Sequence, residues 1–161
     1  MLAYVFRPVS ARDLPLLRQW LATPEVVRWW GDPDEQAELL KQDISDPRMV
    51  MRIVSFEGKP FAYAQDYAVH SWPQPHFVSL PADARAIDSF IGEPDMIGRG
   101  HGAAYLRLLA EQLRAEGAPL VAIDPNEGNH RARRAYKRAG FRGETVVESV
   151  DGRVVPMFFY G

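Results

Sequence analysis

The stretch Ile97-Gly98-Arg99-Gly100-His101-Gly102-Ala103 leads directly into a helical pattern of apolar residues over positions 104–109. Its three glycines stand at every second position and carry no Cβ, so a ligand can approach the backbone of this loop closely. The free N–H groups of the loop and the positive end of the following helix then point to one place. The stretch therefore predicts a site for a phosphate or pyrophosphate, with an ordinary glycine turn as the alternative.

The composition is that of a globular enzyme or binding module. The 161 residues predict a single domain, with 47% hydrophobic and 25% charged residues. No apolar run approaches the roughly 20 residues that span a bilayer, and the N-terminal residues lack the pattern of a signal peptide. Because the sequence contains no cysteine, disulfides, thiolate metal sites and cysteine nucleophiles are excluded. We expect one cytoplasmic domain over residues 1–161, with no membrane partner.

The net charge of −2 gives no electrostatic footprint for nucleic acid, and no nucleic-acid partner is expected. Basic residues nevertheless cluster at Arg131, Arg133, Arg134, Lys137 and Arg138. In a short helix beside a cofactor loop, this cluster suits the phosphates of a mononucleotide. A solvated helix face explains it equally well, so the sequence leaves both interpretations open.

Alternating and helical hydrophobic patterns predict the element order β-α-α-α-β-β-β-α-β-α-β-β. Ser10 with Asp13 has the pattern of a capping box, and Thr23 followed by Pro24 has that of a helix N-cap and first helical position. Glu57-Gly58-Lys59 is predicted to turn the strand before it into the next one as a hairpin, and Asp151-Gly152 is a strong hairpin signal between the last two strands. The expected strands cover residues 4–9, 49–56, 60–69, 84–91, 120–124, 141–150 and 153–160, and the expected helices cover 10–21, 25–30, 32–44, the segment from the glycine loop to Gly117, and 130–138.

A second run, Asn129-His130-Arg131-Ala132-Arg133-Arg134-Ala135-Tyr136-Lys137-Arg138-Ala139-Gly140-Phe141, follows the glycine loop and its helix after one predicted strand. The two motifs, in this order, resemble those of the GNAT acetyltransferases, and the resemblance extends over the chain in element order. It implies a GNAT fold of the α/β class: a central mixed β-sheet, mostly antiparallel and splayed, flanked by helices on both faces. The family usually begins its loop with Gln or Arg, where this chain has Ile97.

The resemblance also implies that acetyl-CoA is the co-substrate and that no metal takes part. In the family the glycine loop binds the pyrophosphate through backbone N–H groups, and the preceding strand pairs with the pantetheine arm. His101 is therefore expected to contribute mainly its N–H. The implied cofactor-binding residues are Ser89, Phe90, Ile91, Ile97, Gly98, Arg99, Gly100, His101, Gly102, Ala103, Asn129, Ala132 and Tyr136.

A narrower resemblance is to the aminoglycoside 6'-N-acetyltransferases. It rests on Tyr4-Val5-Phe6-Arg7-Pro8, Val27-Arg28-Trp29-Trp30-Gly31, Tyr63-Ala64-Gln65-Asp66-Tyr67, Ile87-Asp88, Asp124-Pro125 and Asp151-Gly152. The acceptor-binding residues that it implies are Trp29, Trp30, Gln65, Tyr67, Asp88, Asp124 and Asp151. The clearest departure is His70-Ser71-Trp72-Pro73-Gln74-Pro75-His76, which replaces a longer segment bordering the acceptor site in the family. His70 and His76 are weak candidates for catalysis.

The chemistry of these residues suits a polycationic acceptor. Separate carboxylates in one cleft would hold the ammonium groups of an amino sugar by charge-assisted hydrogen bonds. Asp88 lies inside an apolar strand, where an unpaired carboxylate is costly, and is predicted to hold the ammonium and to take or relay its proton. Asp124 and Asp151 also suit plain turns, and the tryptophans also suit a core. Tyr136 is the predicted acid for the departing CoA thiolate, with packing of its helix as the alternative.

The leading prediction is direct transfer, in a ternary complex, of acetyl from acetyl-CoA to a primary amine. The resemblance makes the 6'-amine of aminoglycosides the expected acceptor and antibiotic resistance the implied role. An acyltransferase acting on a lysine or hydroxylamine siderophore precursor is the second hypothesis, because Ile91-Gly92-Glu93-Pro94 also occurs in that group. A non-catalytic acyl-CoA-binding module is the third, against which the presence of Asp88 and Tyr136 argues. We expect a monomer or homodimer whose partner is a small-molecule amine.

Overall fold

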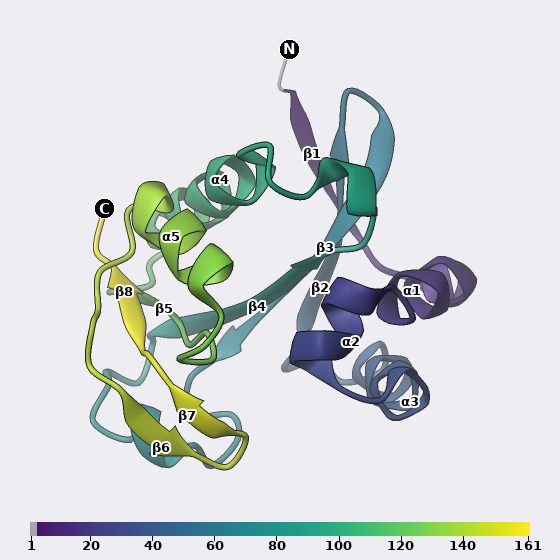
Figure 1. Ribbon diagram of the computed structural model, residues 1–161. Helices are drawn as coiled ribbons and strands as arrows, with labels where there is room; N and C mark the ends of the chain where they lie inside the picture. Colours follow the sequence, from purple (N-terminus) through teal and green to yellow (C-terminus); the bar gives the residue numbers. More distant parts are fainter. Residues whose placement is uncertain (1–2) are drawn as a thin grey trace. The chain divides into compact units, whose positions relative to one another are not determined.

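The computed structural model describes residues 3–161, whose strands form two sheets (Figure 1). The larger sheet has six strands in the order β1-β2-β3-β4-β5-β8, and the smaller sheet pairs β6 with β7. The β4–β5 pair is parallel, whereas β1–β2, β2–β3 and β5–β8 are antiparallel, which confirms the predicted α/β class with a mixed, mostly antiparallel sheet. The strands are β1 (Tyr4–Pro8), β2 (Val50–Phe56), β3 (Lys59–Ala68), β4 (Arg85–Ile91), β5 (Val121–Ile123), β6 (Val147–Ser149), β7 (Gly152–Val154) and β8 (Met157–Phe159). The helices are α1 (Leu14–Leu21), α2 (Pro24–Trp30), α3 (Pro33–Asp43), α4 (His101–Ala115) and α5 (His130–Ala139), with short 3-10 turns η1 (Ala11–Asp13), η2 (Pro75–Phe77) and η3 (Pro94–Met96).

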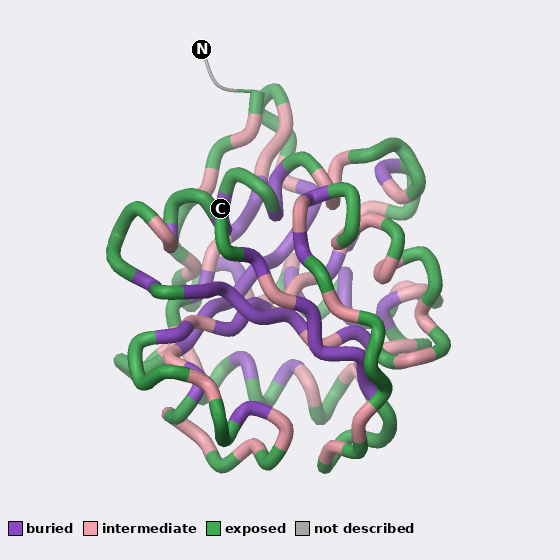
Figure 2. The backbone as a smooth tube through the Cα atoms, turned by 90° about the vertical axis from the view of Figure 1, so that its left-hand side faces the viewer, coloured by how far each residue is buried: buried purple, intermediate pink, exposed green. Residues whose placement is uncertain are grey.

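Two compact units make up the chain. The first comprises the chain up to Asp66 together with Ser89–Arg99, and the second comprises Tyr67–Asp88 together with Gly100–Gly161. Strands β3 and β4 therefore contribute residues to both units. Buried residues concentrate in β3 and β5, and the tube in Figure 2 shows long buried stretches of chain. That the whole chain acts as a single domain stays a prediction.

In the first unit, local side-chain bonds fix where the helices begin. The Asp13 carboxylate accepts a hydrogen bond from the Ser10 N–H at 2.9 Å and pairs with Arg7 at 2.7 Å, so the predicted capping box is confirmed. Thr23 occupies the N-cap position of α2, but its hydroxyl donates to the Trp20 carbonyl at 2.7 Å. The predicted N-cap Thr23 and first helical residue Pro24 are thus confirmed, although the Thr23 side chain makes no capping hydrogen bond to the residues of α2.

The apolar core of the first unit is built around Trp20, which is completely buried. Its indole donates to Glu93 Oε2 at 2.6 Å. Gly92 lies directly against the ring, since a Cβ at this position would be 2.1 Å from Trp20 Cγ. Packing, and not backbone conformation, therefore requires this glycine. The buried members of the core are Leu17, Trp20, Leu21, Val26, Ala37, Leu40, Met51, Ile53, Tyr63 and Phe90.

The β2–β3 hairpin turns at Glu57 and Gly58, whose φ angles are 49° and 82°. A two-residue turn with both central residues at positive φ has the twist that its flanking strands require. Glycine adopts this conformation without a steric penalty. The register joins Phe56 to Lys59 across the turn, so the predicted hairpin is confirmed.

In the second unit, β4 and β5 run parallel and are registered through Arg85–Ala86 of β4. β5 ends at Ile123, so Asp124 comes directly after it, and Asp88 lies two residues beyond the registered segment of β4. The carboxyl ends of parallel strands are the usual place for ligands in such sheets. Helix α4 packs against α5 and buries Tyr105, Leu106, Leu109, Ala110 and Leu113.

The prediction of two long C-terminal strands over residues 141–150 and 153–160 is wrong, because this part of the chain forms three short strands. Strand β6 pairs with β7 in the small sheet, whereas β8 pairs with β5 in the large one. Pro156 lies between β7 and β8 and has no N–H to give a ladder, so one strand cannot run through it. Ser149 pairs with Gly152, which puts the hairpin tip at Val150-Asp151, one residue earlier than predicted.

Candidate active site

The glycine loop ends at the N-terminus of α4. Gly98 and Gly100 have φ angles of 78° and 86°, a conformation that favours glycine. A Cβ at either position would meet no atom within 4 Å, so the conformation and not the packing accounts for these glycines. The first N–H groups of a helix have no partner within it and point out of its N-terminus. This arrangement is consistent with the predicted pyrophosphate site, which stays a prediction.

The remaining predicted cofactor residues lie on either side of this loop. Ile91 ends β4, and Ile97 and Arg99 lie in the loop itself. The first turn of α4 supplies the segment His101–Ala103, with Gly102 inside the helix.

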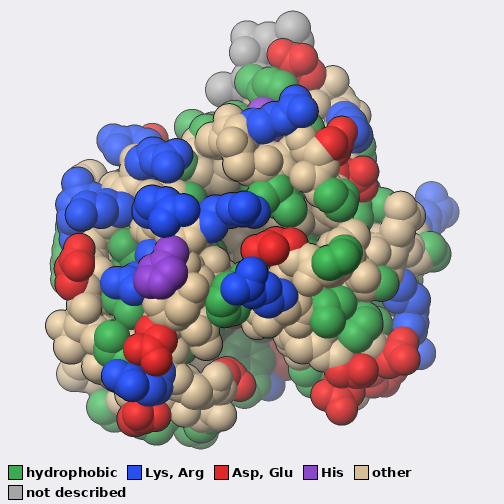
Figure 3. Space-filling model, in the orientation of Figure 1, with side chains coloured by type: hydrophobic (Ala, Val, Ile, Leu, Met, Phe, Trp, Pro, Cys, Tyr) green, Lys and Arg blue, Asp and Glu red, His purple; other side chains and the backbone are tan. Residues whose placement is uncertain are grey.

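Helix α5 begins with a side-chain cap. Asn129 Oδ1 accepts a hydrogen bond from the Ala132 N–H at 3.2 Å. This bond explains the asparagine at position 129 by the capping of α5. Contact of Asn129 and Ala132 with the cofactor stays a prediction. Figure 3 shows Lys and Arg side chains gathered over α4 and α5. Arg131, Arg134 and Arg138 are exposed on α5, so a phosphate site and a solvated face both remain compatible with this cluster.

Three carboxylates that the sequence predicts at the acceptor site raise the pKa of one buried phenol, that of Tyr67. Tyr67, near the end of β3, is 4% exposed. Burial raises the pKa of this phenol, and the charges of Asp88, Asp124 and Asp151 raise it further, against a hydrogen bond from Gln74. Negative charge opposes ionisation of a phenol only when it lies near. The second unit therefore brings together Tyr67 and the three aspartates, as the sequence predicts.

Tyr136 on α5 shares two of these neighbours. Burial raises its pKa above the ordinary value, and Tyr105, Asp88 and Asp124 raise it further. Its ring also packs against Phe141, at 6.4 Å between ring centroids. The phenol therefore keeps its proton at neutral pH and can donate a hydrogen bond, while the ring contributes to packing.

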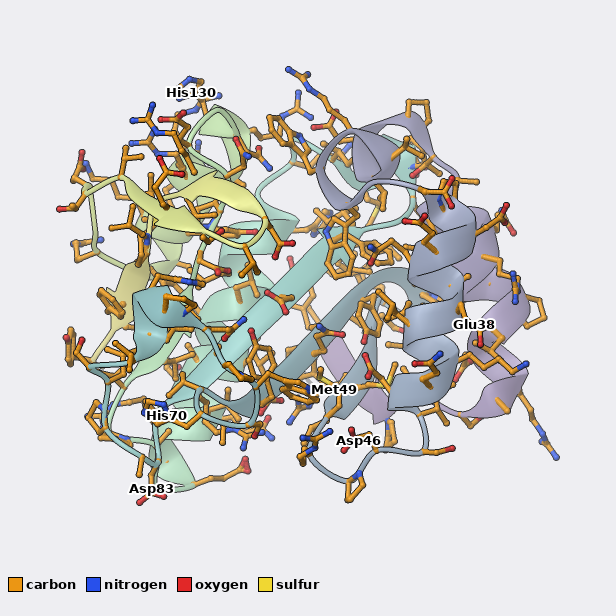
Figure 4. All side chains as sticks on the ribbon, turned by 90° about the horizontal axis from the view of Figure 1, so that it is seen from below. Glu38, Asp46, Met49, His70, Asp83 and His130 are labelled. Carbon is orange, nitrogen blue, oxygen red and sulfur yellow. The ribbon has the colours of Figure 1, made fainter. Side chains whose placement is uncertain are left out.

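The loop between β3 and β4 contacts this acidic group, and sequence reasoning gave it too little weight. Figure 4 labels His70 and Asp83 at the two ends of the loop, and the Val69 N–H donates to the Ala84 carbonyl at 3.0 Å to close it. His76 Nε2 donates to Asp124 Oδ2 at 2.7 Å. The signal that pointed here was the departure of this loop from the family pattern.

The tryptophan pair lies in the first unit, and its two members differ. Trp30 packs edge-on against Phe90 at 5.1 Å and against Tyr63 at 6.3 Å, so it is part of the aromatic core. Trp29 donates its indole N–H to Glu25 at 3.1 Å and has the Arg28 guanidinium 4.8 Å from its ring centroid. Trp30 therefore packs against the core, the alternative that the sequence left open. Stacking of Trp29 or Trp30 on an acceptor stays a prediction.

Three further predicted residues of the first unit have defined contacts. Gln65 is 8% exposed and its Oε1 accepts from the Tyr63 hydroxyl at 2.6 Å. Ser89 donates its hydroxyl to the Tyr63 carbonyl at 2.7 Å. The Phe90 side chain is buried in the core, so its backbone is what the predicted pantetheine pairing would use.

Within residues 3–161, no group of three or more His, Asp or Glu side chains is placed so that it could hold a metal ion. In the same part of the chain, no helix has the length and apolar character needed to cross a membrane.

Comparison with known proteins matches residues 9–149 to the acetyltransferase (GNAT) domain. An aminoglycoside N(6')-acetyltransferase type 1 from Klebsiella pneumoniae is 29% identical over 164 residues, which cover 94% of this chain and 80% of that protein. A solved structure of the aminoglycoside acetyltransferase AAC(6')-Ib with coenzyme A and kanamycin has a TM-score of 0.86 and 26% identity, covering 98% of this chain and 94% of that one. An aminoglycoside N(6')acetyltransferase from Legionella pneumophila shares the fold, with a TM-score of 0.80 and 21% identity over 99% of this chain and 92% of that one. The predicted family and fold are thereby confirmed, and the chain belongs to the GNAT acetyltransferases.

Proposed function

We propose that this protein transfers the acetyl group of acetyl-CoA to a primary amine of a polycationic small molecule, with the 6'-amine of an aminoglycoside as the acceptor. The relatives support this acceptor class, since they are aminoglycoside acetyltransferases by name and one solved structure holds acetyl-CoA. The observation that carries the proposal is that the carboxylates of Asp88, Asp124 and Asp151 lie near enough to the Tyr67 phenol to raise its pKa. A cytoplasmic enzyme, as a monomer or homodimer, is part of the same proposal.

The carboxylates suit an acceptor with several ammonium groups. Each ammonium that donates to a carboxylate makes a charge-assisted hydrogen bond, worth about 1.5–3 kcal/mol. Asp88 and Asp124 are half-buried, whereas Asp151 is exposed at the β6–β7 turn. Water and salt screen an exposed pair more strongly than a half-buried one. Asp88 should therefore contribute more to acceptor binding than Asp151.

The transfer forms one C–N bond and breaks one C–S bond. The neutral amine nitrogen attacks the thioester carbonyl carbon, and CoA leaves as a thiolate. The nitrogen gives up its proton, and the sulfur takes one. Asp88 holds the ammonium and takes or relays its proton, while the N–H groups of the glycine loop hold the pyrophosphate and Ser89–Ile91 pairs with the pantetheine arm.

The raised pKa of Tyr136 refines its role. A thiol has an ordinary pKa of about 8.5 and a phenol one of about 10, so proton transfer from tyrosine to a thiolate is already uphill. Raising the pKa of the phenol makes that transfer less favourable still. Tyr136 therefore acts as a hydrogen-bond donor that stabilises charge developing on the sulfur, and the proton that finally reaches the sulfur comes from the amine.

The test is release of free thiol from acetyl-CoA with a panel of amines. Kanamycin, ribostamycin, spermidine, lysine and N6-hydroxylysine are compared at equal concentration, and the acetylated product is located by NMR. The proposal expects turnover with the aminoglycosides and acetylation at the 6'-amine. Turnover confined to lysine or its hydroxylamine would favour the siderophore hypothesis, and no turnover with any amine would favour the non-catalytic one.

A further inference from the structure

Part of the acidic group is already paired with a residue of the protein. His76 Nε2 donates to Asp124 Oδ2 at 2.7 Å, and the two side chains are 3% and 20% exposed. Two positions earlier, the Gln74 amide donates to the Tyr67 hydroxyl at 3.3 Å. Trp72 meets the same tyrosine edge-on, at 5.4 Å between ring centroids. One short segment of the loop thus contacts two of the predicted acceptor residues.

We propose that His76 is a specificity-determining residue, which occupies the Asp124 carboxylate and thereby limits how many ammonium groups of an acceptor the protein can pair. The inference rests on the proposed function, because it concerns the same acidic group. A carboxylate oxygen that accepts a bond of 2.7 Å from an imidazole is not free for an ammonium at the same position. An ammonium that takes this position on Asp124 Oδ2 must first displace His76.

The contacts of the loop also indicate that this displacement is feasible. His76 Nδ1 and Gln74 Oε1 are buried and have no hydrogen-bond partner among residues 3–161. Leaving a buried polar atom without a partner costs about 1–3 kcal/mol. The closed position of the loop is therefore held less firmly than its burial alone suggests, and both atoms regain partners in water when the segment moves out.

This arrangement ranks acceptors by charge. Ammonium groups that pair with Asp88 and Asp151 bind with the loop in place. A further ammonium that reaches Asp124 gains a charge-assisted bond but loses the one from His76, so its net gain is small. Removing the imidazole should therefore strengthen binding of the most highly charged acceptors.

A double-mutant cycle tests this competition. The substitutions are His76→Phe, which keeps an aromatic ring against Phe77, and Asp124→Asn, alone and combined. Binding of kanamycin and of spermidine to the CoA-loaded proteins is measured by calorimetry. When His76 is present, Asp124→Asn should weaken binding of the acceptor less than about threefold. In the His76→Phe background it should weaken binding about tenfold, and His76→Phe alone should tighten it by a similar factor.

A matched control and a second variant keep the result interpretable. His70→Phe removes the other histidine of this loop, whose Nε2 lies 2.7 Å from the Leu80 carbonyl oxygen, and should leave the effect of Asp124→Asn unchanged. If His76→Phe does not fold, His76→Ala takes its place in the cycle.

Equal effects of Asp124→Asn in both backgrounds, weaker binding in the His76→Phe protein, or no binding by any of the four proteins would each overturn the inference. Calorimetry requires no turnover, so a failed acetyl transfer counts against the proposed function and not against this competition.

Discussion

Replacing Gly92 by alanine tests the packing of the first unit at its tightest point. The added Cβ would lie 2.1 Å from Trp20 Cγ and 2.2 Å from Cδ2, whereas carbon atoms prefer a separation of about 3.5–4.0 Å. The ring has little freedom to yield, because Trp20 is completely buried and donates to Glu93 at 2.6 Å. The backbone is also held, since the Gly92 N–H donates to the Phe61 carbonyl at 2.8 Å. One of these contacts must break.

The expected loss of stability follows from those contacts. Overpacking a core costs about 1–3 kcal/mol, and loss of the indole hydrogen bond adds about 1 kcal/mol. We therefore expect Gly92→Ala to lower the free energy of unfolding by about 2–4 kcal/mol, or Tm by roughly 5–15 °C.

Urea unfolding followed by circular dichroism measures this loss. Gly58→Ala is the comparison, because that glycine has a φ of 82° but open space around it. Strain from the left-handed backbone alone costs about 1–2 kcal/mol, so Gly58→Ala should be the milder change. A loss below about 0.5 kcal/mol for Gly92→Ala would refute the claim that the Trp20 ring is fixed against Gly92.

Three further changes test separate parts of the account. Arg52→Met removes the cation that pairs with the buried Asp66 carboxylate and should lower the free energy of unfolding by about 3 kcal/mol in urea. Adding Asp66→Leu should recover most of that loss. An equal loss in the single and the double variant would contradict the pairing. The hydrogen bond from Arg7 lowers the pKa of Asp13, so the stability that Asp13 adds is full above about pH 4 and is lost as the pH falls through its folded-state pKa. Asp13→Asn should therefore lower Tm at pH 7, and the difference in Tm from the wild type should narrow by pH 3. A difference in Tm that stays constant with pH would contradict this. Tyr136→Phe keeps the ring and removes the hydroxyl that is proposed to stabilise charge on the sulfur, so kcat in the thiol assay should fall by about 100-fold or more. A fall below about threefold would exclude the donor role.

Elements specified by neighbouring residues could be predicted from the sequence. The Glu57-Gly58 turn is one case, because both residues take the positive φ that a two-residue hairpin needs. The capping box at Ser10 and Asp13 is another, since its atoms lie within three residues of one another. The buried face of α4 follows from helical periodicity alone.

Features that depend on distant contacts could not be predicted in the same way. Residues 141–160 read as two paired strands, but Pro156 and the pairing of β8 with β5 divide them between two sheets. His76 and Asp124 are 48 positions apart, and no local pattern indicates that an imidazole in a proline-rich loop pairs with that carboxylate. The grouping of Asp88 and Asp124 was predictable because both follow the registered ends of parallel strands.

Substitution of Asp88 tests the central claim most directly. Asp88→Asn keeps the size of the side chain but loses its charge and basicity. In the thiol assay with kanamycin, kcat/KM should fall at least about 100-fold, while the Kd of acetyl-CoA by calorimetry stays within about twofold of the wild type. Asp83→Asn, at an exposed position of the loop before β4, is the matched control and should leave both values unchanged. Near-normal turnover by the Asp88→Asn protein would contradict the account and would move the search for the ammonium-binding residue to Asp124.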